Sequence, residues 1–397
     1  MRGRILLGLA VLVAAALGLN YLRPVPAVAA TSSVVSQKTI AGSAPTLPWP
    51  SDGSAAVGVS GLGKLADSGN ETQVPTASVA KVMTALVVMH DKPLGLGQTG
   101  PSITVTDEDV QAYQTDLQQK QSVVAVQAGE VLTQYQALQA MLIPSGNNIA
   151  ELLARWDAGS VPAFVDRMNE RARALGLAKS KFADPAGADT GTVSTASDLL
   201  VLAMVAMTDP VIAQIVSLPQ VQLPVAGLEY NVNAALGQDG IVGIKTGSGL
   251  AQGANFLFAA TVTVTGHQVT IFGCVMGQPT LGAAFSAARA LIRAMQPALT
   301  VKQELARNQA VGGYDTPWGT HSDLISTVDV PLVEWPGMIL RERLDARVLS
   351  IDRPVNPGTP AGTVHVVMGD YDLAVPVVTA NQLYPPGRLW RLTRLSI

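Results

Sequence analysis

A serine and a lysine stand three residues apart in a stretch of the chain that is apolar nearly all round. The segment PTASVAKVMTALVV, residues 75–88, carries Ser78 and Lys81 among alanine, valine, leucine and methionine residues, the composition of a helix enclosed by protein. We expect Thr76 or Ser78 to cap this helix. Residues three apart share a helix face, burial disfavours an ammonium, and a neutral amine can take a proton from an adjacent serine. The pair indicates a nucleophile and its base, although a single such pair also fits a lysine that snorkels or pairs with a carboxylate.

A second polar triplet, Ser-Gly-Asn, follows in LIPSGNN at the junction of two helical segments. The hydroxyl of Ser145 can relay a proton between the lysine amine and a leaving amine. The amide of Asn147 can hold a peptide carbonyl, because it carries two N–H donors. An earlier Ser-Gly-Asn at 68–70 precedes the nucleophile and has the composition of a turn.

A third triplet, Lys-Thr-Gly, lies in GIKTGSG at residues 245–247. We expect it on a strand at the edge of a sheet. There Lys245 would supply a positive field and Thr246 a hydrogen-bond donor for a substrate carboxylate. Any one triplet is a weak signal, whereas the ordered set of three is a strong one.

Ser-x-x-Lys, Ser-x-Asn and Lys-Thr-Gly in this order resemble the signature of the serine penicillin-recognising enzymes. Over roughly residues 50–298 the chain is similar to the D-alanyl-D-alanine carboxypeptidases, the low-molecular-mass penicillin-binding proteins. The similar segments are MLIPSGNNIAELLA, FVDRMNERARALGL, KFADPAGAD, VSTASDLLVLA and GIVGIKTGSG. The resemblance implies that Ser78 is the acylated nucleophile, Lys81 its proton acceptor and Ser145 the third catalytic residue. It implies that the substrate is bound by Asn147, Lys245, Thr246, Gly247 and Ser248, with the N–H groups of Ser78 and Ser248 as the oxyanion hole.

The same resemblance implies an activity and its partners. The enzyme would remove the terminal D-alanine from peptidoglycan stem peptides, and penicillins would acylate it; no cofactor or metal is expected. The chain departs from many relatives in three places. Val79-Ala80 supplies no hydroxyl between the nucleophile and the lysine, Ser248-Gly249 is small, and MGQPT at 276–280 lacks an arginine.

Two other functions stay open at this point. A class A β-lactamase would need a glutamate that holds a deacylating water between the second and third triplets. The acidic candidates are not in the usual Glu-x-x-Leu-Asn context; they include Glu151, Asp166, Glu170 and Asp184. The second of these functions is that of a cell-wall-binding scaffold, which keeps the fold but has lost turnover.

Other chemistry finds little support in the sequence. GVSGLGK at 58–64 resembles a phosphate-binding loop, but Leu65 follows where a magnesium-ligating hydroxyl would be needed, so we expect a hairpin turn. The four histidines are scattered and form no triad or metal pattern. Cys274, the single cysteine, lies in an apolar run and is expected in the core. The net charge of −3 without a basic run argues against a nucleic acid partner.

The length and termini predict an exported protein of two domains. At 397 residues the chain exceeds what one core usually organises. Residues 1–30 have the three parts of a secretory signal peptide. Arginines come first, an apolar centre runs from Ile5 to Leu19, and the small residues of PVPAVAA suit a cleavage site. The alternative is an uncleaved anchor over Ile5–Leu22, which would attach the protein to the membrane. Either way the body is extracytoplasmic, at the cell wall or membrane. Residues 31–48 are expected to form a linker.

The remaining pattern predicts an α+β fold. Helical periodicity occurs at 134–142, 147–156, 162–175, 196–207 and 281–296, and Thr265-Gly266 separates two strands of a hairpin. Helices between two groups of strands predict an antiparallel sheet built from both ends of a domain at 49–298, as in DD-peptidases and β-lactamases. Residues 300–397 predict a small all-β domain, with the terminal RLWRLTRLSI as its last strand.

Overall fold

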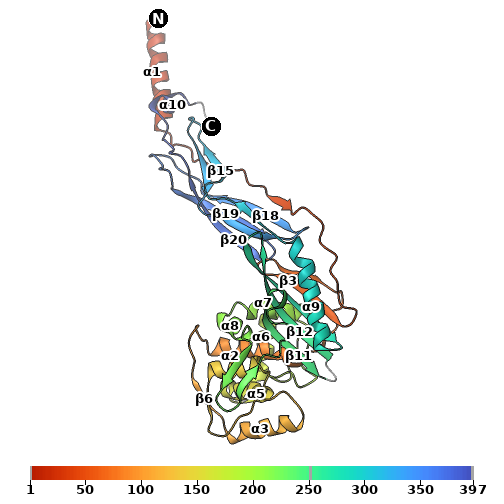
Figure 1. Ribbon diagram of the computed structural model, residues 1–397. Coiled ribbons are helices and arrows are strands. Elements are labelled where there is room, and N and C mark those ends of the chain that lie inside the picture. Colours follow the sequence, from red (N-terminus) through yellow and green to blue (C-terminus); the bar gives the residue numbers. More distant parts are fainter. Residues whose placement is uncertain (1, 250–252, 395–397) are drawn as a thin grey trace. The chain divides into compact units, whose positions relative to one another are not determined.

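The computed structural model describes residues 2–249 and 253–394. The chain forms two compact units, one of residues 44–300 and one that joins residues up to 43 with those from 301 onward. Figure 1 shows the course of the chain through both. Each unit has a sheet of its own, and the three triplets of the sequence analysis lie in the first.

The sheet of residues 44–300 is antiparallel and draws its strands from both ends of the unit. Among the described residues five strands follow the order β11-β12-β13-β3-β4. Their bounds are β3 Ser54–Val59, β4 Gly63–Asp67, β11 Ile241–Gly249, β12 Gly253–Val264 and β13 His267–Gln278. Thr265 and Gly266 both have positive φ, which suits the two-residue turn of the β12–β13 hairpin. The predicted α+β class, the sheet built from two ends and both hairpins are confirmed.

Two sets of helices cover the two faces of this sheet. Phe272, Cys274 and Met276, alternate residues of β13, belong to the large helical core. On the other face Phe256 of β12 packs edge-to-face on Phe285 of α9, with ring centroids 4.9 Å apart. The helices are α2 Lys81–Asp91, α3 Asp107–Gln118, α4 Gln134–Leu142, α5 Asn147–Ala158, α6 Val161–Ala174, α7 Ala196–Ala206, α8 Pro210–Val216 and α9 Leu281–Met295. The five helices expected from periodicity are confirmed, whereas α3 and the short α8 were not predicted.

Helix α2 lies at the centre, in contact with α4, α5, α6 and α7. Its residues 81–89 are all buried, as expected of an enclosed helix. The capping prediction is wrong, because a 3₁₀ turn, η1 Ala77–Ala80, precedes α2 and neither Thr76 nor Ser78 makes a side-chain cap. Ser78 lies inside this turn, where tertiary contacts fix the backbone. Smaller elements of the unit are β5 Val74–Pro75, β6 Ser102–Thr104, β7 Val131–Thr133, β8 Val193–Ser194, β9 Gln220–Leu223, β10 Gly227–Tyr230, η2 Gln238–Gly240 and η3 Gln296–Ala298.

The other unit holds an antiparallel sheet whose seven described strands follow the order β1-β15-β16-β20-β19-β18-β2. Its edge strands, β1 Ala30–Ser32 and β2 Gln37–Thr39, come from the segment predicted as a linker. This segment forms strands instead of a linker because β15 and β18 would otherwise have unpaired backbone N–H and C=O groups along one edge. β1 and β2 form hydrogen bonds with these groups. The remaining strands are β14 Thr300–Leu305, β15 Ala310–Asp315, β16 His321–Ser326, β17 Val330–Glu334, β18 Ile339–Ala346, β19 Pro360–Met368 and β20 Tyr371–Thr379.

Both termini of the described chain are helical and belong to this unit. Helix α1, Arg2–Leu22, covers the predicted signal or anchor segment. The C-terminal segment was predicted as a strand, which is wrong for its described part: Arg388–Thr393 forms helix α10. It packs on α1 while β1 and β2 occupy the two edges of the sheet. Residues 395–397 of the predicted strand lie outside the described residues.

Candidate active site

The Lys81 amine is surrounded by three oxygen atoms. Its Nζ lies 2.8 Å from Ser78 Oγ, 2.5 Å from Asn147 Oδ1 and 3.0 Å from the carbonyl oxygen of Ala186. The Lys81 side chain is fully buried, whereas Ser78 is half-buried and so reachable. A neutral amine has two N–H donors and one lone pair. The two donors match Asn147 and Ala186, which leaves the lone pair for the Ser78 hydroxyl proton.

Electrostatics also favour the neutral amine. Burial holds the pKa of Lys81 well below its ordinary value, and the nearby Lys245 ammonium lowers this pKa further. The carboxylates of Asp184 and Asp116 act in the opposite direction. Within the part of the chain that the structure describes, neither is hydrogen-bonded to Lys81. Burial and Lys245 thus favour the neutral amine, the form that a general base needs.

The turn that carries Ser78 is held by close backbone approaches. Ala77 has φ 47°, an uncommon conformation for a residue with a side chain. A Cβ on Gly187 would stand 1.8 Å from the Ala77 carbonyl oxygen, so only glycine fits there. The fully buried Asn255 of β12 donates through Nδ2 to the carbonyls of Pro75 and Thr76, at 3.1 and 3.0 Å. These contacts fasten the nucleophile turn to the sheet.

A loop after α6 presents the carbonyl that meets Lys81. The Asp184 carboxylate accepts hydrogen bonds from the N–H groups of Ala186 and Ala188 and from the Thr192 hydroxyl. Thr84 of α2 donates to the Pro185 carbonyl at 2.6 Å. Asp184 thus folds the loop so that the Ala186 carbonyl points to the amine. No sequence pattern marks this role, because the group that accepts the hydrogen bond from Lys81 is a backbone carbonyl.

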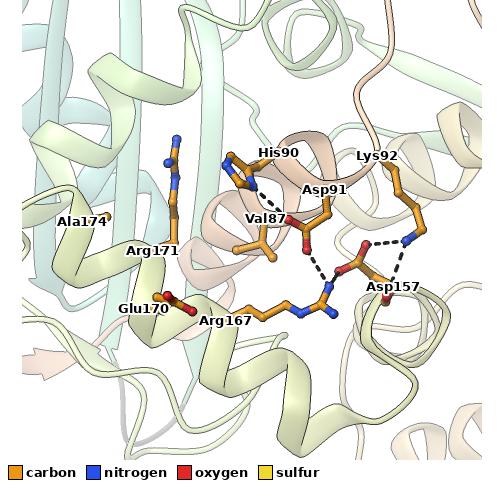
Figure 2. Close-up of a pocket in the computed structure, with 9 residues that line it drawn as sticks. All are labelled: Val87, His90, Asp91, Lys92, Asp157, Arg167, Glu170, Arg171 and Ala174. Carbon is orange, nitrogen blue, oxygen red and sulfur yellow. Dashed lines mark hydrogen bonds and ion pairs between the residues drawn. The ribbon is translucent and has the colours of Figure 1, made fainter.

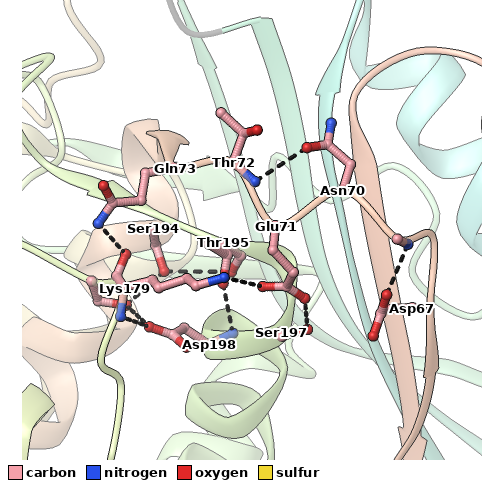
Figure 3. A network of polar contacts seen from close by, with 12 residues as sticks. Asp67, Asn70, Glu71, Thr72, Gln73, Lys179, Ser194, Thr195, Ser197 and Asp198 are labelled. Atoms are coloured by element: carbon pink, nitrogen blue, oxygen red, sulfur yellow. Dashed lines mark hydrogen bonds and ion pairs between the residues drawn. The ribbon is translucent and has the colours of Figure 1, made fainter.

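A polar network fastens the segment that leads to the nucleophile (Figure 3). Gln73 donates to the Lys179 carbonyl at 3.0 Å, and the Ser197 hydroxyl donates to Glu71. Directly after this segment, β5 pairs with β8. Residues 71–75 are therefore bound to the start of α7 and to the loop that follows α6.

Ser145 and Asn147 lie where α4 gives way to α5. Ser145 is buried with φ 72°, and its hydroxyl has no hydrogen-bond partner among the described residues. The Asn147 amide donates to Gln121, and its backbone N–H donates to the Ser122 carbonyl at 2.8 Å. The loop after α3 therefore orients the amide whose oxygen meets Lys81. Gln121 was not predicted, since a glutamine in a polar loop carries no distinctive pattern.

The Lys-Thr-Gly triplet lies on β11, the edge strand of the sheet, as expected. Lys245 is buried, its Nζ donates to the Thr246 carbonyl at 3.1 Å, and burial lowers its pKa to about 7. A Cβ on Gly247 would stand 3.0 Å from the Ser78 nitrogen and 2.7 Å from the Thr76 carbonyl oxygen. Ser248 is exposed. The strand thus passes directly beside the backbone N–H of the candidate nucleophile.

Asp116 on α3 is a buried carboxylate that the sequence did not reveal. It is 7% exposed, and its Oδ2 has no hydrogen-bond partner in the described chain. Burial, together with Glu151, raises its pKa to about 6, while Lys81 lowers it. Asp116 and Lys81 therefore influence each other's protonation.

A pocket of about 620 Å³ lies at the C-terminal end of α2, where His90, Asp91 and Lys92 line it, and so at the other end of this helix from Ser78. Figure 2 shows the residues that line it. Arg167 joins Asp91 and Asp157 at 2.6 and 2.9 Å, and Lys92 lies 3.1 Å from Asp157. Glu170, one of the acidic residues considered for a β-lactamase, lines this pocket. The ion pairs join α2, α5 and α6 and have no contact with Ser78 or Lys81, so we assign them a structural role.

A family model described as D-alanyl-D-alanine carboxypeptidase matches residues 60–280, more than half of the chain. The chain belongs to this family. The match contains all three triplets, and the resemblance inferred from them is confirmed.

Individual relatives match over different lengths. DacB2 of Mycobacterium tuberculosis, a D-alanyl-D-alanine carboxypeptidase, is 33% identical over 47% of this chain and 62% of its own length. A D-alanyl-D-alanine endopeptidase of Pseudomonas aeruginosa is 33% identical over 42% of this chain and 51% of its own. The carboxypeptidase DacD of Escherichia coli is 27% identical over 81% and 84%. The chain thus spans about half to three fifths of the length of the first two relatives.

Solved structures share the fold. Penicillin-binding protein 5 from Haemophilus influenzae has a TM-score of 0.63 at 19% identity, over 86% of this chain and 99% of its own. The Streptomyces K15 DD-transpeptidase has a TM-score of 0.56 at 25% identity, over 62% of this chain and 98% of its own. The predicted DD-peptidase-like fold is confirmed.

Proposed function

We propose that this protein is a serine-type D-alanyl-D-alanine carboxypeptidase. It removes the terminal D-alanine from peptidoglycan stem peptides through an acyl-enzyme on Ser78. The observation that carries the proposal is the fully buried Lys81 amine, whose Nζ lies 2.8 Å from Ser78 Oγ and within hydrogen-bond distance of Asn147 Oδ1 and the Ala186 carbonyl oxygen. Family membership supports the substrate class.

In the proposed acylation, Ser78 Oγ attacks the carbonyl carbon of the penultimate D-alanine while its proton passes to Lys81 Nζ. The oxyanion that forms is stabilised by the N–H groups of Ser78 and Ser248. The C–N bond then breaks, and the leaving amine receives the proton from Lys81 through the Ser145 hydroxyl. D-Alanine departs, and an ester joins the remaining peptide to Ser78.

Substrate binding uses groups that the fold leaves available. Asn147 Nδ2 has two hydrogens, and Gln121 accepts one, which leaves the other for a peptide carbonyl. Lys245 and Thr246 on the edge strand meet the terminal carboxylate. An anionic carboxylate beside Lys245 favours its ammonium form, so substrate binding raises a pKa that burial has lowered.

Deacylation follows the same steps in reverse order, with water in place of D-alanine. Lys81 takes the proton of the attacking water, and the Ser78 ester is cleaved. We expect this step to be slow for penicillins, because none of the acidic β-lactamase candidates lies in the Glu-x-x-Leu-Asn context. Two of them have other partners: Glu151 pairs with Arg155 at 3.4 Å, and Asp184 accepts three hydrogen bonds within its own loop. Rapid turnover of nitrocefin would contradict this assignment.

The named relatives include both carboxypeptidases and endopeptidases. Both activities require the same acylation; they differ in the leaving group, which is free D-alanine in one and a cross-linking amine in the other. We propose the carboxypeptidase reaction.

The test is to incubate the purified protein with a diacetylated L-Lys-D-Ala-D-Ala peptide, with a monomeric pentapeptide muropeptide and with a cross-linked muropeptide dimer. Release of free D-alanine from the first two, absent in Ser78→Ala, is the expected result. Cleavage of the dimer alone would replace the carboxypeptidase by an endopeptidase. If no substrate gives a product while penicillin still labels the protein, the protein is a cell-wall-binding scaffold that has lost turnover.

A further inference from the structure

Helix α1 is an apolar helix that the protein leaves uncovered. The window Gly3–Leu22 has a mean hydropathy of 2.3, and none of it is buried. Twenty residues at 1.5 Å per residue give about 30 Å, the thickness of the hydrocarbon core of a bilayer. Length and composition alone are equally consistent with a secretory signal. What distinguishes the two fates is how the rest of the protein binds the base of this helix.

The last turn of α1 is bound by the C-terminal segment. Asn20 Nδ2 donates to the carbonyls of Leu392 and Arg394, at 3.2 and 2.6 Å. In return the Arg394 guanidinium donates to the carbonyl of Asn20 at 2.9 Å and to those of Arg23 and Pro24, at 2.5 and 3.0 Å. Carbonyls at a helix C-terminus lack partners within the helix, and a guanidinium is well suited to satisfy several at once.

Aromatic and basic side chains surround this junction. The Arg391 guanidinium lies over the Tyr21 ring, 5.9 Å from its centroid. Trp390 packs edge-to-face on Trp318 at 5.3 Å and donates to the Pro317 carbonyl. Tryptophan, tyrosine and arginine next to the end of a long apolar helix are typical of the boundary between lipid and water. Leu389, on the same short helix, is 76% exposed.

The residues that would have to be cut in a cleaved signal are part of the fold. Val28 is 5% exposed and pairs with Leu349, with N···O distances of 2.8 and 2.9 Å. Two residues on, β1 pairs with β15. Cleavage after residue 29 or 30 would remove Val28 and its bridge to Leu349 and would leave α10 without its partner helix.

We propose that α1 is retained as a membrane anchor and that α10 clasps its base at the lipid surface. The partner of α1 is the hydrocarbon core of a phospholipid bilayer. We call the contact set of Asn20, Tyr21, Trp390, Arg391 and Arg394 the base clasp. The basic N-terminal residues Arg2 and Arg4 stay on the cytoplasmic side, which places the rest of the chain after α1, with both sheets, outside.

The first test is the N-terminus of the full-length protein in the membranes of a bacterial host. Mass spectrometry of the purified protein should find residues 2–22 present and the protein in the carbonate-washed membrane pellet. A mature chain that begins between residues 28 and 31 would overturn the proposal.

The second test concerns the clasp and uses two matched arginine variants of α10. Arg394→Ala, directly after α10, removes the guanidinium hydrogen bonds to the carbonyls of Asn20, Arg23 and Pro24. Arg388→Ala makes the same change at an exposed position at the start of α10. In phosphatidylglycerol-containing nanodiscs, amide hydrogen exchange of residues 388–394 should be about tenfold faster or more in Arg394→Ala than in Arg388→Ala or the wild type. Equal exchange in the two variants would overturn the clasp.

Discussion

The backbone nitrogen of Ser78 lies 3.0 Å from the point where a Cβ on Gly247 would stand. Strand β11 therefore approaches the nucleophile turn as closely as backbone atoms allow. Replacing this glycine should separate two elements that are otherwise intact, and its effect should fall on the oxyanion hole.

We expect Gly247→Ala to lower the rate of penicillin acylation by up to about 100- to 1,000-fold, the cost of losing one oxyanion-hole donor. The control is Gly282→Ala on α9, where the nearest atom, Thr280 Oγ1, would be 3.8 Å from the new Cβ. Stopped-flow acylation with a fluorescent penicillin measures both. Equal acylation rates in the two variants would show that the close approach of β11 to Ser78 is not needed for acylation.

Lys81→Met should retain the fold and lose the base. We expect acylation to fall by about 100- to 10,000-fold, the usual range for losing a general base. Lys181→Met, at an exposed lysine without an ion pair in the described structure, is the matched control and should acylate normally. Circular dichroism checks the fold. A folded Lys81→Met that acylates at the wild-type rate would remove the lysine from the mechanism.

Asp116→Asn should shift the pH dependence of acylation. The Asp116 carboxylate raises the pKa of Lys81, so its removal lowers that pKa, and the neutral amine persists to lower pH. When the acylation rate is measured against pH, the fall in rate on the acidic side (the acidic limb) should therefore occur at lower pH. Asp107→Asn, an exposed change on the same helix, should leave the limb in place. A limb that moves to higher pH, or does not move, would contradict this coupling.

Asn255→Ala should weaken both the fold and the site. It leaves the carbonyls of Pro75 and Thr76 and the N–H of Gly277 without their partner. Unsatisfied buried groups of this kind cost about 1–3 kcal/mol each. A lower urea midpoint and slower acylation are expected, whereas Asn70→Ala, in an exposed turn, should change neither by much. An unchanged urea midpoint would contradict this prediction and would show that water takes over the hydrogen bonds of the Asn255 amide.

The sequence was sufficient for features that depend on local pattern. Helical periodicity predicted α4, α5 and α6, and the Thr265-Gly266 pair predicted the β12–β13 turn. The contact between Ser78 and Lys81 followed from their spacing, because one helical turn brings the two side chains together. These features need no knowledge of the rest of the chain.

Features that depend on tertiary contact were not predictable in this way. The acceptor at Ala186 is a backbone carbonyl and has no side-chain signature. Asp116 looks like any acidic residue of an amphipathic helix until its burial is known. The strand predicted at the C-terminus became a helix because α1, far away in sequence, supplies its partners.

The most direct measurement of the central claim is the site of penicillin attachment. The protein is incubated with benzylpenicillin, denatured and digested with trypsin, and the peptide Leu65–Lys81 is sequenced by tandem mass spectrometry. We predict one penicilloyl group per chain, located on Ser78 and absent from Ser78→Ala. A label on any other residue, or an equally labelled Ser78→Ala, would contradict the assignment of Ser78 as the nucleophile.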